Sequence, residues 1–94
     1  MTPEKKVKNK VCEILKAHDC YYFYASTGGY GASGIPDIVA CYKGNFIGIE
    51  CKANGNKPTA LQNKHLNNIK KAQGYSMVID ETDIDALELF LKTL

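Results

Sequence analysis

Two short segments on either side of Lys43, Gly44 and Asn45 alternate apolar and polar side chains, and this pattern constrains the fold more than any other feature. Gly-Asn between residues 37–42 and 46–52 predicts a two-residue hairpin turn of type II′, in which Gly supplies the positive φ at the first position. The alternation places the following apolar residues on one face of the hairpin: Ile38, Ala40, Ile47, Ile49 and Cys51. This is the alternation that a half-buried sheet requires.

Helix and strand signals flank this hairpin. Thr2-Pro3-Glu4 is a helix start, and Thr59 and Thr82 are predicted to cap two further helices, of which the first ends at Gly74. The expected elements are a helix over 2–18, strands over 20–25, 37–42 and 46–52, a helix over 59–73, a strand over 75–79 and a terminal helix. The predicted fold class is therefore α/β, with the order α-β-β-β-α-β-α and neither a linker nor an internal repeat.

The length and composition indicate one globular domain over residues 1–94. The chain has 94 residues, of which 45% are hydrophobic and 23% are charged, and domains typically contain about 100–200 residues. A domain of this size has one modest core, so a large substrate must be met on its surface or shared with a second subunit. This favours dimerisation.

The positive charges are all lysine, twelve against ten acids, for a net charge of +2. Without Arg, the chain lacks the side chain best suited to bidentate contacts with phosphate or guanine. Five of the lysines fall in the first helix: Lys5, Lys6, Lys8, Lys10 and Lys16. They form either a solvated helix face or a positive surface for DNA.

Four cysteines occur without a CxxC pair or a Cys/His pair at zinc-ligand spacing: Cys12, Cys20, Cys41 and Cys51. We expect reduced thiols in the core. No apolar run of eighteen residues and no signal-peptide pattern is present, so we expect no membrane association and a cytoplasmic location, in the host cytoplasm if a phage encodes the chain.

The polar face of the hairpin concentrates charged groups at its open end. With Gly44 and Asn45 in the turn, Val39 lies opposite Glu50 and Asp37 opposite Lys52, and directly opposed residues share a face of the sheet. Two carboxylates and an ammonium group therefore meet within about 5–8 Å at the backbone.

Two oxygen ligands at this separation suit Mg²⁺ or Mn²⁺, which also take water and substrate phosphate. The backbone carbonyl of Cys51 offers a third protein oxygen. A metal there would activate water, and Lys52 would neutralise developing negative charge, which is the chemistry of phosphodiester hydrolysis. The alternative is a surface Asp37–Lys52 pair with Glu50 merely solvated.

Three motifs in order carry a family resemblance. Gly34-Ile35-Pro36-Asp37 is followed after twelve residues by Glu50-Cys51-Lys52, and then by Pro58-Thr59-Ala60-Leu61-Gln62. With the element order, this resembles the virus-type replication-repair nuclease (VRR-NUC) domains of the PD-(D/E)xK nuclease superfamily, over essentially the whole chain. The resemblance implies a restriction-endonuclease-like core.

The resemblance also implies roles for individual residues. Asp37 and Glu50 would bind Mg²⁺ or Mn²⁺ together with the Cys51 carbonyl, Lys52 would be the catalytic lysine, and Gln62 would support the site. The residues themselves leave Gln62 open, because Thr59-x-x-Gln62 is also a capping box.

The family and its Holliday-junction-resolvase relatives also use a Glu from the first helix. Lys8 occupies the position that would align with it, so this chain departs from the pattern. Glu4 is one turn earlier and in phase with the apolar stripe, whereas Glu13 falls outside that stripe. We therefore favour Glu4 over Glu13 as an additional metal ligand.

The glycine-rich segment Gly29–Gly34 fits G-x-G-x-x-G but leads into a strand instead of a helix, so we expect no dinucleotide site and no nucleotide cofactor. Its Tyr30 is predicted to stack on a base or sugar. With no basic residue in this loop, DNA contacts are expected from Lys6 and Lys10 of the first helix.

The resulting interpretation is a metal-dependent, structure-selective DNA endonuclease of phage type. Stand-alone viral members of the family look like junction-resolving enzymes, which implies branched DNA, such as a four-way (Holliday) junction, as substrate and a homodimer as the assembly. The alternatives are a nicking or restriction-like endonuclease on plain duplex, a non-cleaving module that binds structured DNA, and a small interaction module whose polar trio is accidental.

Overall fold

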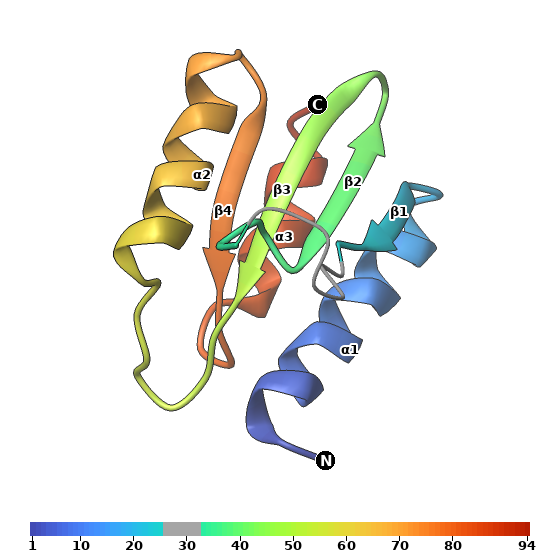
Figure 1. The fold of residues 1–94 in the computed structure, drawn as a ribbon. Coiled ribbons are helices and arrows are strands. Elements are labelled where there is room, and N and C mark those ends of the chain that lie inside the picture. The colour runs from blue at the N-terminus through green and yellow to red at the C-terminus, as the bar shows by residue number, and fades with distance from the viewer. Residues whose placement is uncertain (26–32) are drawn as a thin grey trace.

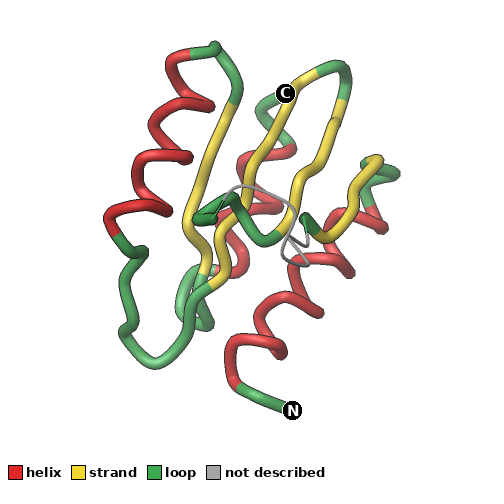
Figure 2. Tube along the Cα trace, viewed as in Figure 1, coloured by secondary structure: helices red, strands yellow, loops and turns green. Residues whose placement is uncertain are grey.

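The predicted hairpin lies in the middle of a four-stranded sheet with helices on both faces (Figures 1 and 2). The computed structural model describes residues 1–25 and 33–94. The elements in chain order are α1 (Pro3–Ala17), β1 (Tyr21–Tyr24), β2 (Ile38–Tyr42), β3 (Asn45–Cys51), α2 (Ala60–Lys71), β4 (Tyr75–Ile79) and α3 (Ile84–Leu91). The order α-β-β-β-α-β-α is therefore confirmed.

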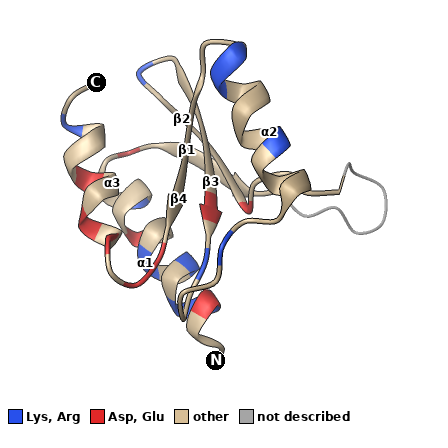
Figure 3. Ribbon diagram, turned by 90° about the vertical axis from the view of Figure 1, so that its left-hand side faces the viewer, with Lys and Arg blue, Asp and Glu red and all other residues tan. Residues whose placement is uncertain are grey.

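The sheet has the strand order β1-β2-β3-β4, in which β1, β2 and β3 are antiparallel and β4 runs parallel to β3. Helices α1 and α3 cover one face and α2 covers the other, giving three layers (Figure 3). The face toward α1 and α3 carries the main core, which includes the predicted apolar set: Ile38, Ala40, Ile47, Ile49 and Cys51.

Helix α1 begins where the sequence places it. The Thr2 side chain caps the helix by accepting a hydrogen bond from the Lys5 backbone N–H at 3.2 Å, and Pro3 occupies the first turn, where a missing N–H costs nothing. Val7, Val11 and Leu15 are buried against the sheet. Full burial of each such side chain stabilises the fold by about 1.5–3 kcal/mol.

The hairpin register differs from the predicted one by two residues. The turn residues are Lys43 and Gly44, both with positive φ (52° and 80°), and Tyr42 pairs with Asn45. Positive φ at both central positions is a type I′ turn, whose twist suits a hairpin as well as that of type II′. The predicted pairings of Val39 with Glu50 and of Asp37 with Lys52 are therefore wrong, and Val39 pairs with Gly48.

The ends of the last two helices also differ from expectation. Two residues after the end of α2, Gln73 and not Gly74 adopts the left-handed conformation (φ 71°). The Gly74 N–H donates to the Ile69 carbonyl at 2.9 Å. This is a Schellman ending, which Gly usually serves. The N-cap residue of α3 is Asp83, which makes no side-chain hydrogen bond to the helix, whereas Thr82 donates its backbone N–H to the Asp80 carboxylate.

The four cysteines are all free, as expected, but only two of them are buried. Cys20 and Cys51 lie in the core, Cys12 is half-buried, and Cys41 is exposed on β2. Cys41 lies outside because it alternates with Ala40, which faces the core. Within residues 1–25 and 33–94, no helix has the length and apolar character needed to cross a membrane.

The Gly and Pro of Gly34-Ile35-Pro36-Asp37 pack against the α2 layer. Gly34 has a φ of 82°, and a Cβ at this position would lie 2.7 Å from the Leu61 Cγ and 2.9 Å from the Leu61 carbonyl carbon. The Pro36 ring lies over Gly48, where a Cβ would meet the Pro36 Cγ at 3.1 Å. These close contacts fix the path of the segment that runs from Gly34, which lies beside the start of α2, to Asp37.

Replacing Gly34 by Ala should lower the free energy of unfolding by roughly 2–4 kcal/mol, because a left-handed residue and an overpacked contact each cost about 1–2 kcal/mol. Gly55 is the matched control, since it also has a positive φ (75°) but nothing within 4 Å of its Cβ position. Gly55→Ala should cost only about 1 kcal/mol. Urea unfolding of both variants measures the difference, and equal losses would contradict the close approach.

Candidate functional site

Glu50 is a buried carboxylate with nothing to neutralise it directly. It lies on β3 between Ile49 and Cys51, both of which face the core under α1, so the Glu50 side chain points toward the α2 layer. The residue is 1% exposed, and neither carboxylate oxygen has a hydrogen-bond partner. A buried charge left in this way is costly, so this position needs a specific explanation.

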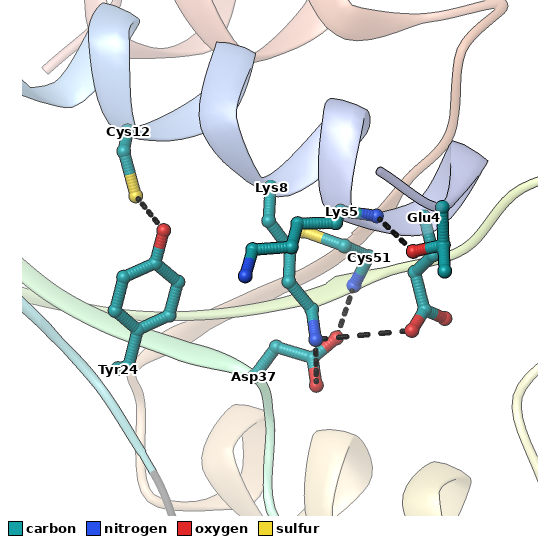
Figure 4. Close-up of polar contacts among 8 residues, drawn as sticks. Glu4, Lys5, Lys8, Cys12, Tyr24, Asp37 and Cys51 are labelled. Carbon is teal, nitrogen blue, oxygen red and sulfur yellow. Dashed lines mark hydrogen bonds and ion pairs between the residues drawn. The ribbon is translucent and has the colours of Figure 1, made fainter.

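Asp37 lies at the open end of the hairpin, just before β2, and links three segments of the chain (Figure 4). Its Oδ2 accepts the backbone N–H of Cys51 at 2.9 Å, and its Oδ1 lies 3.6 Å from the Nζ of Lys8 on α1. Asp37 is thus tied to the end of β3 on one side and to α1 on the other.

The two carboxylates interact electrostatically. Burial raises the pKa of Glu50 to about 8; the neighbouring Asp37 carboxylate adds to the shift because its negative charge favours the protonated form of Glu50, while the positive charge of Lys52 opposes it. In the ionised form the pair is electron-rich and partly shielded from water. A cation placed there would replace the proton that Glu50 otherwise retains.

These residues fit a divalent metal ion. The unpartnered oxygens of Glu50 and the carboxylate of Asp37 are hard oxygen donors of the kind that Mg²⁺ and Mn²⁺ prefer. The Cys51 main chain faces Asp37, and because a strand residue directs its N–H and C=O to the same neighbour, its carbonyl points to that side as well. In the part of the chain that the structure describes, no three His, Cys, Asp or Glu side chains form a metal-binding group.

Lys52 follows Glu50 by two residues and therefore lies on the same face of the sheet, directly after β3. Its backbone N–H donates to the Ile79 carbonyl at 2.9 Å, which holds the residue beside β4. The side chain is only partly buried. Its ammonium group can therefore serve both the carboxylates and a ligand at the edge of the site.

Gln62 forms the capping box. Its Oε1 accepts the Thr59 backbone N–H at 2.9 Å, and its own N–H donates to the Thr59 Oγ1 at 3.2 Å. The side-chain oxygen is thus engaged in starting α2, whereas the amide N–H groups stay available to a ligand. The role at the site implied by the resemblance remains a prediction.

The first helix presents Lys8 to Asp37, with Glu4 behind it. Lys8 Nζ lies 3.7 Å from Glu4 Oε2, an i, i+4 pair, and Glu4 acts on Glu50 only as a weaker, more distant charge. Glu13 is exposed on another side of α1. The contact between Lys8 and Asp37 was not predicted. The i, i+4 spacing of Glu4 and Lys8 indicates only the ion pair between those two residues.

The predicted DNA-contact residues lie apart from Asp37 or outside the described residues. Lys6 and Lys10 line a cavity with Glu13 and Glu81, on roughly the opposite side of α1 from Lys8. Tyr30 falls within residues 26–32, outside the described part of the chain. The roles of these three residues remain predictions.

Comparison with known proteins identifies the family. No family model matches the chain. A protein described as "Putative nuclease p44", from Acyrthosiphon pisum secondary endosymbiont phage 1, is 32% identical over 81 residues, which cover 85% of this chain and 84% of the relative. The chain belongs to the family of this phage nuclease.

Solved structures agree on the fold. A structure described as a VRR_NUC domain superposes with a TM-score of 0.78 at 22% identity, covering 93% of this chain and 95% of that one. Hjc from Archaeoglobus fulgidus, a Holliday junction resolvase, superposes with a TM-score of 0.56 at 19% identity, covering 79% of this chain and 63% of that one. The predicted VRR-NUC resemblance and the restriction-endonuclease-like α/β core are therefore confirmed.

Removing the buried charge should change the pH dependence of stability. The pKa of Glu50 is about 8 in the folded protein against an ordinary value of 4.5, so between these pH values the folded state holds more protons than the unfolded state. The free energy of unfolding therefore falls as pH rises through this window. In chelator, Glu50→Gln should be more stable than the natural chain by about 2 kcal/mol at pH 8.5 and nearly equal to it at pH 5.

Thermal unfolding at the two pH values measures this difference. Glu13→Gln, which removes an exposed acid from α1, is the control and should give the same small difference at both. An E50Q variant that is less stable than the natural chain at pH 8.5 would show that the Glu50 charge is compensated.

Proposed function

We propose that this chain is a DNA endonuclease that hydrolyses phosphodiester bonds with Mg²⁺ or Mn²⁺ held by Asp37, Glu50 and the Cys51 carbonyl. The single observation that carries the proposal is the Glu50 carboxylate, buried beside Asp37 with both oxygens unpartnered. Membership of a nuclease family supports it. A protein gains no stability from such a pair of acids, so their arrangement is best explained by a cation that they bind during function.

The residues divide the chemistry among them. A bound divalent ion lowers the pKa of water and stabilises charge on a phosphate. Asp37 is held for this role by the Cys51 N–H, which donates to its Oδ2, while its Oδ1 faces Lys8. Lys52 orients the attacking water or neutralises the charge that develops on the phosphate oxygens, and the Gln62 amide N–H groups contact the same phosphate. Glu4 is an additional acid at the rim, one turn before Lys8.

Branched DNA is the proposed substrate. The similarity of the fold to Hjc, described as a Holliday junction resolvase, supports a four-way junction. The competing functions are cleavage of plain duplex by a nicking or restriction-like enzyme, and binding of structured DNA without cleavage. Two carboxylates facing a polyanion disfavour the last of these.

Cleavage of matched linear duplex, flap and four-way-junction DNA tests this proposal. With Mg²⁺ or Mn²⁺ we expect paired symmetric cuts in the junction, no cuts in chelator, and a loss of at least about 10³-fold in rate for Asp37→Asn and Lys52→Ala, because these variants no longer stabilise the transition state. Junction binding should stay within a few-fold of the natural chain.

Lys92→Ala is the control, because it removes an exposed lysine just after α3, on the far face of the sheet from Glu50. It should cleave at the natural rate. Equal cleavage of every substrate would establish the nicking or restriction-like function, and tight binding without cleavage would establish the binding module. Natural rates in the D37N and K52A variants would reject the site.

A homodimer is the proposed assembly, because two active sites related by a dyad suit paired cuts. The edge strand β1 supports this, since Tyr21 and Phe23 are 72% and 48% exposed with ring centroids 6.2 Å apart. An uncovered aromatic edge strand is a common pairing surface.

Sedimentation over a wide concentration range should therefore show a dimer that Tyr21→Ser with Phe23→Ser converts to a monomer. Leu89→Ser, which removes an apolar side chain that is 64% exposed on α3, should leave the dimer intact. A natural chain that stays monomeric throughout would reject the dimer.

The contribution of Lys6 and Lys10 to DNA binding can be measured separately from cleavage. Replacing both with Gln should weaken binding and reduce the slope of log affinity against log salt by about one for each phosphate that the protein no longer neutralises. Lys70→Gln with Lys71→Gln, at the end of α2, is the control for net charge. An unchanged slope in the K6Q/K10Q variant would remove this side of α1 from the DNA surface.

A further inference from the structure

Lys8 already places a positive charge at the candidate metal site. Its Nζ lies 3.6 Å from Asp37 Oδ1 and 3.7 Å from Glu4 Oε2, between acids that come from two different segments (Figure 4). Asp37 Oδ2 is bonded to the Cys51 N–H, so Lys8 partners the oxygen that remains. The carboxylate proposed as a metal ligand is thus engaged on both oxygens, whereas Glu50 is engaged on neither.

The contacts of Lys8 are of a kind that a stronger cation can replace. Both distances exceed the 2.7–2.9 Å or so of a charge-assisted hydrogen bond, so the ammonium group is shared loosely between two acids. The side chains of Lys8 and Asp37 keep 27% and 24% of their surface exposed. Water can therefore solvate the Lys8 ammonium group when it moves away from Asp37, and the exchange leaves no unpaired charge buried in the core.

The charge balance of the cluster also favours exchange over coexistence. With Glu50 ionised, as metal binding requires, Glu4, Asp37 and Glu50 carry three negative charges against the two positive charges of Lys8 and Lys52. A divalent cation added to all five groups would make the cluster net positive, and it would meet the Lys8 ammonium at the same carboxylate. Like charges a few ångströms apart repel one another strongly where the site is partly shielded from water.

We propose that Lys8 is a tethered counter-ion that holds the Asp37 carboxylate in the absence of a divalent ion and competes with that ion for it. Lys8 is then a positioning residue that sets the metal affinity, and this inference rests on the metal site of the proposed function. It keeps Asp37 in place when the site carries no metal, at the expense of weaker metal binding.

The Lys8 side chain has space to move away from Asp37. The lysine borders an open cavity of about 370 Å³, which it lines together with Thr2, Glu4, Lys5 and Tyr24. Because Glu4 is one turn away on the same helix, Lys8 can leave Asp37 and retain this partner. The exchange therefore requires a change of side-chain rotamer and no movement of α1.

Titration with Mn²⁺ alone, followed by the electron paramagnetic resonance signal of the free ion, tests the competition without any measurement of activity. Lys8→Met keeps the length of the side chain and removes its charge, and it should lower the Mn²⁺ dissociation constant by roughly tenfold. Lys16→Met removes the same charge from the exposed last turn of α1 and should change it by less than about twofold.

Thermal unfolding supplies a second readout. In chelator, the K8M variant should unfold at a lower temperature than the natural chain, because two acids lose their counter-ion; saturating Mn²⁺ should reduce or reverse that difference, because tighter binding stabilises the folded state more. If Lys8→Met does not fold in chelator, Lys8→Gln provides the same comparison with a polar side chain.

The outcomes separate this inference from the proposed function. An unchanged or higher dissociation constant for the K8M variant, with Mn²⁺ binding that Asp37→Asn abolishes, would overturn the competition and leave the metal site intact. No Mn²⁺ binding by the natural chain would overturn the metal site and the competition together. A tenfold gain in the K16M variant as well would show a general charge effect and overturn the specific role of Lys8.

Discussion

The hydrogen bond from the Cys51 backbone N–H to Asp37 Oδ2, 2.9 Å long, is the interaction on which the site depends. It lies at the open end of the β2–β3 hairpin, where a side-chain oxygen takes over as acceptor just beyond the pairing of Ile38 with Ile49 that ends the ladder. The path of the chain just before Asp37 depends in turn on Gly34 and Pro36, which pack on the α2 layer. Local packing thus positions the Asp37 carboxylate beside the Glu50 carboxylate, which strand β3 holds in place.

The burial of Glu50 shows a conflict between stability and chemistry. An ionised carboxylate without partners opposes folding, and the raised pKa of Glu50 reflects this cost. The main core lies on the opposite face of the sheet, under α1 and α3, and among residues 1–25 and 33–94 Glu50 is the buried charged residue. The domain therefore separates a conventional apolar core on one face from a polar site on the other.

Much of the fold was predictable because a strand alternates its side chains with a period of two. The predicted turn was one residue too late, which shifted the pairing by two residues and left every side chain on its correct face. The proximity of Asp37 and Glu50 therefore survived a wrong register. The end of α2 was less predictable, because Gln73 adopts a left-handed conformation that is normal for Gly, while Gly74 follows it at a position where a Cβ would lie 3.0 Å from the Ile69 Cγ2.

The sequence by itself determined the order of the elements, the apolar face of the hairpin and the motif residues Asp37, Glu50 and Lys52, since these follow from spacing and local hydrogen bonding. Only the tertiary structure decided that Glu50 loses all but 1% of its exposure and that Lys8, twenty-nine positions before Asp37, lies against it. Both results depend on how helices pack across the sheet. Side-chain periodicity states which way a residue points, but the neighbour that it meets depends on the packing of elements distant in the sequence.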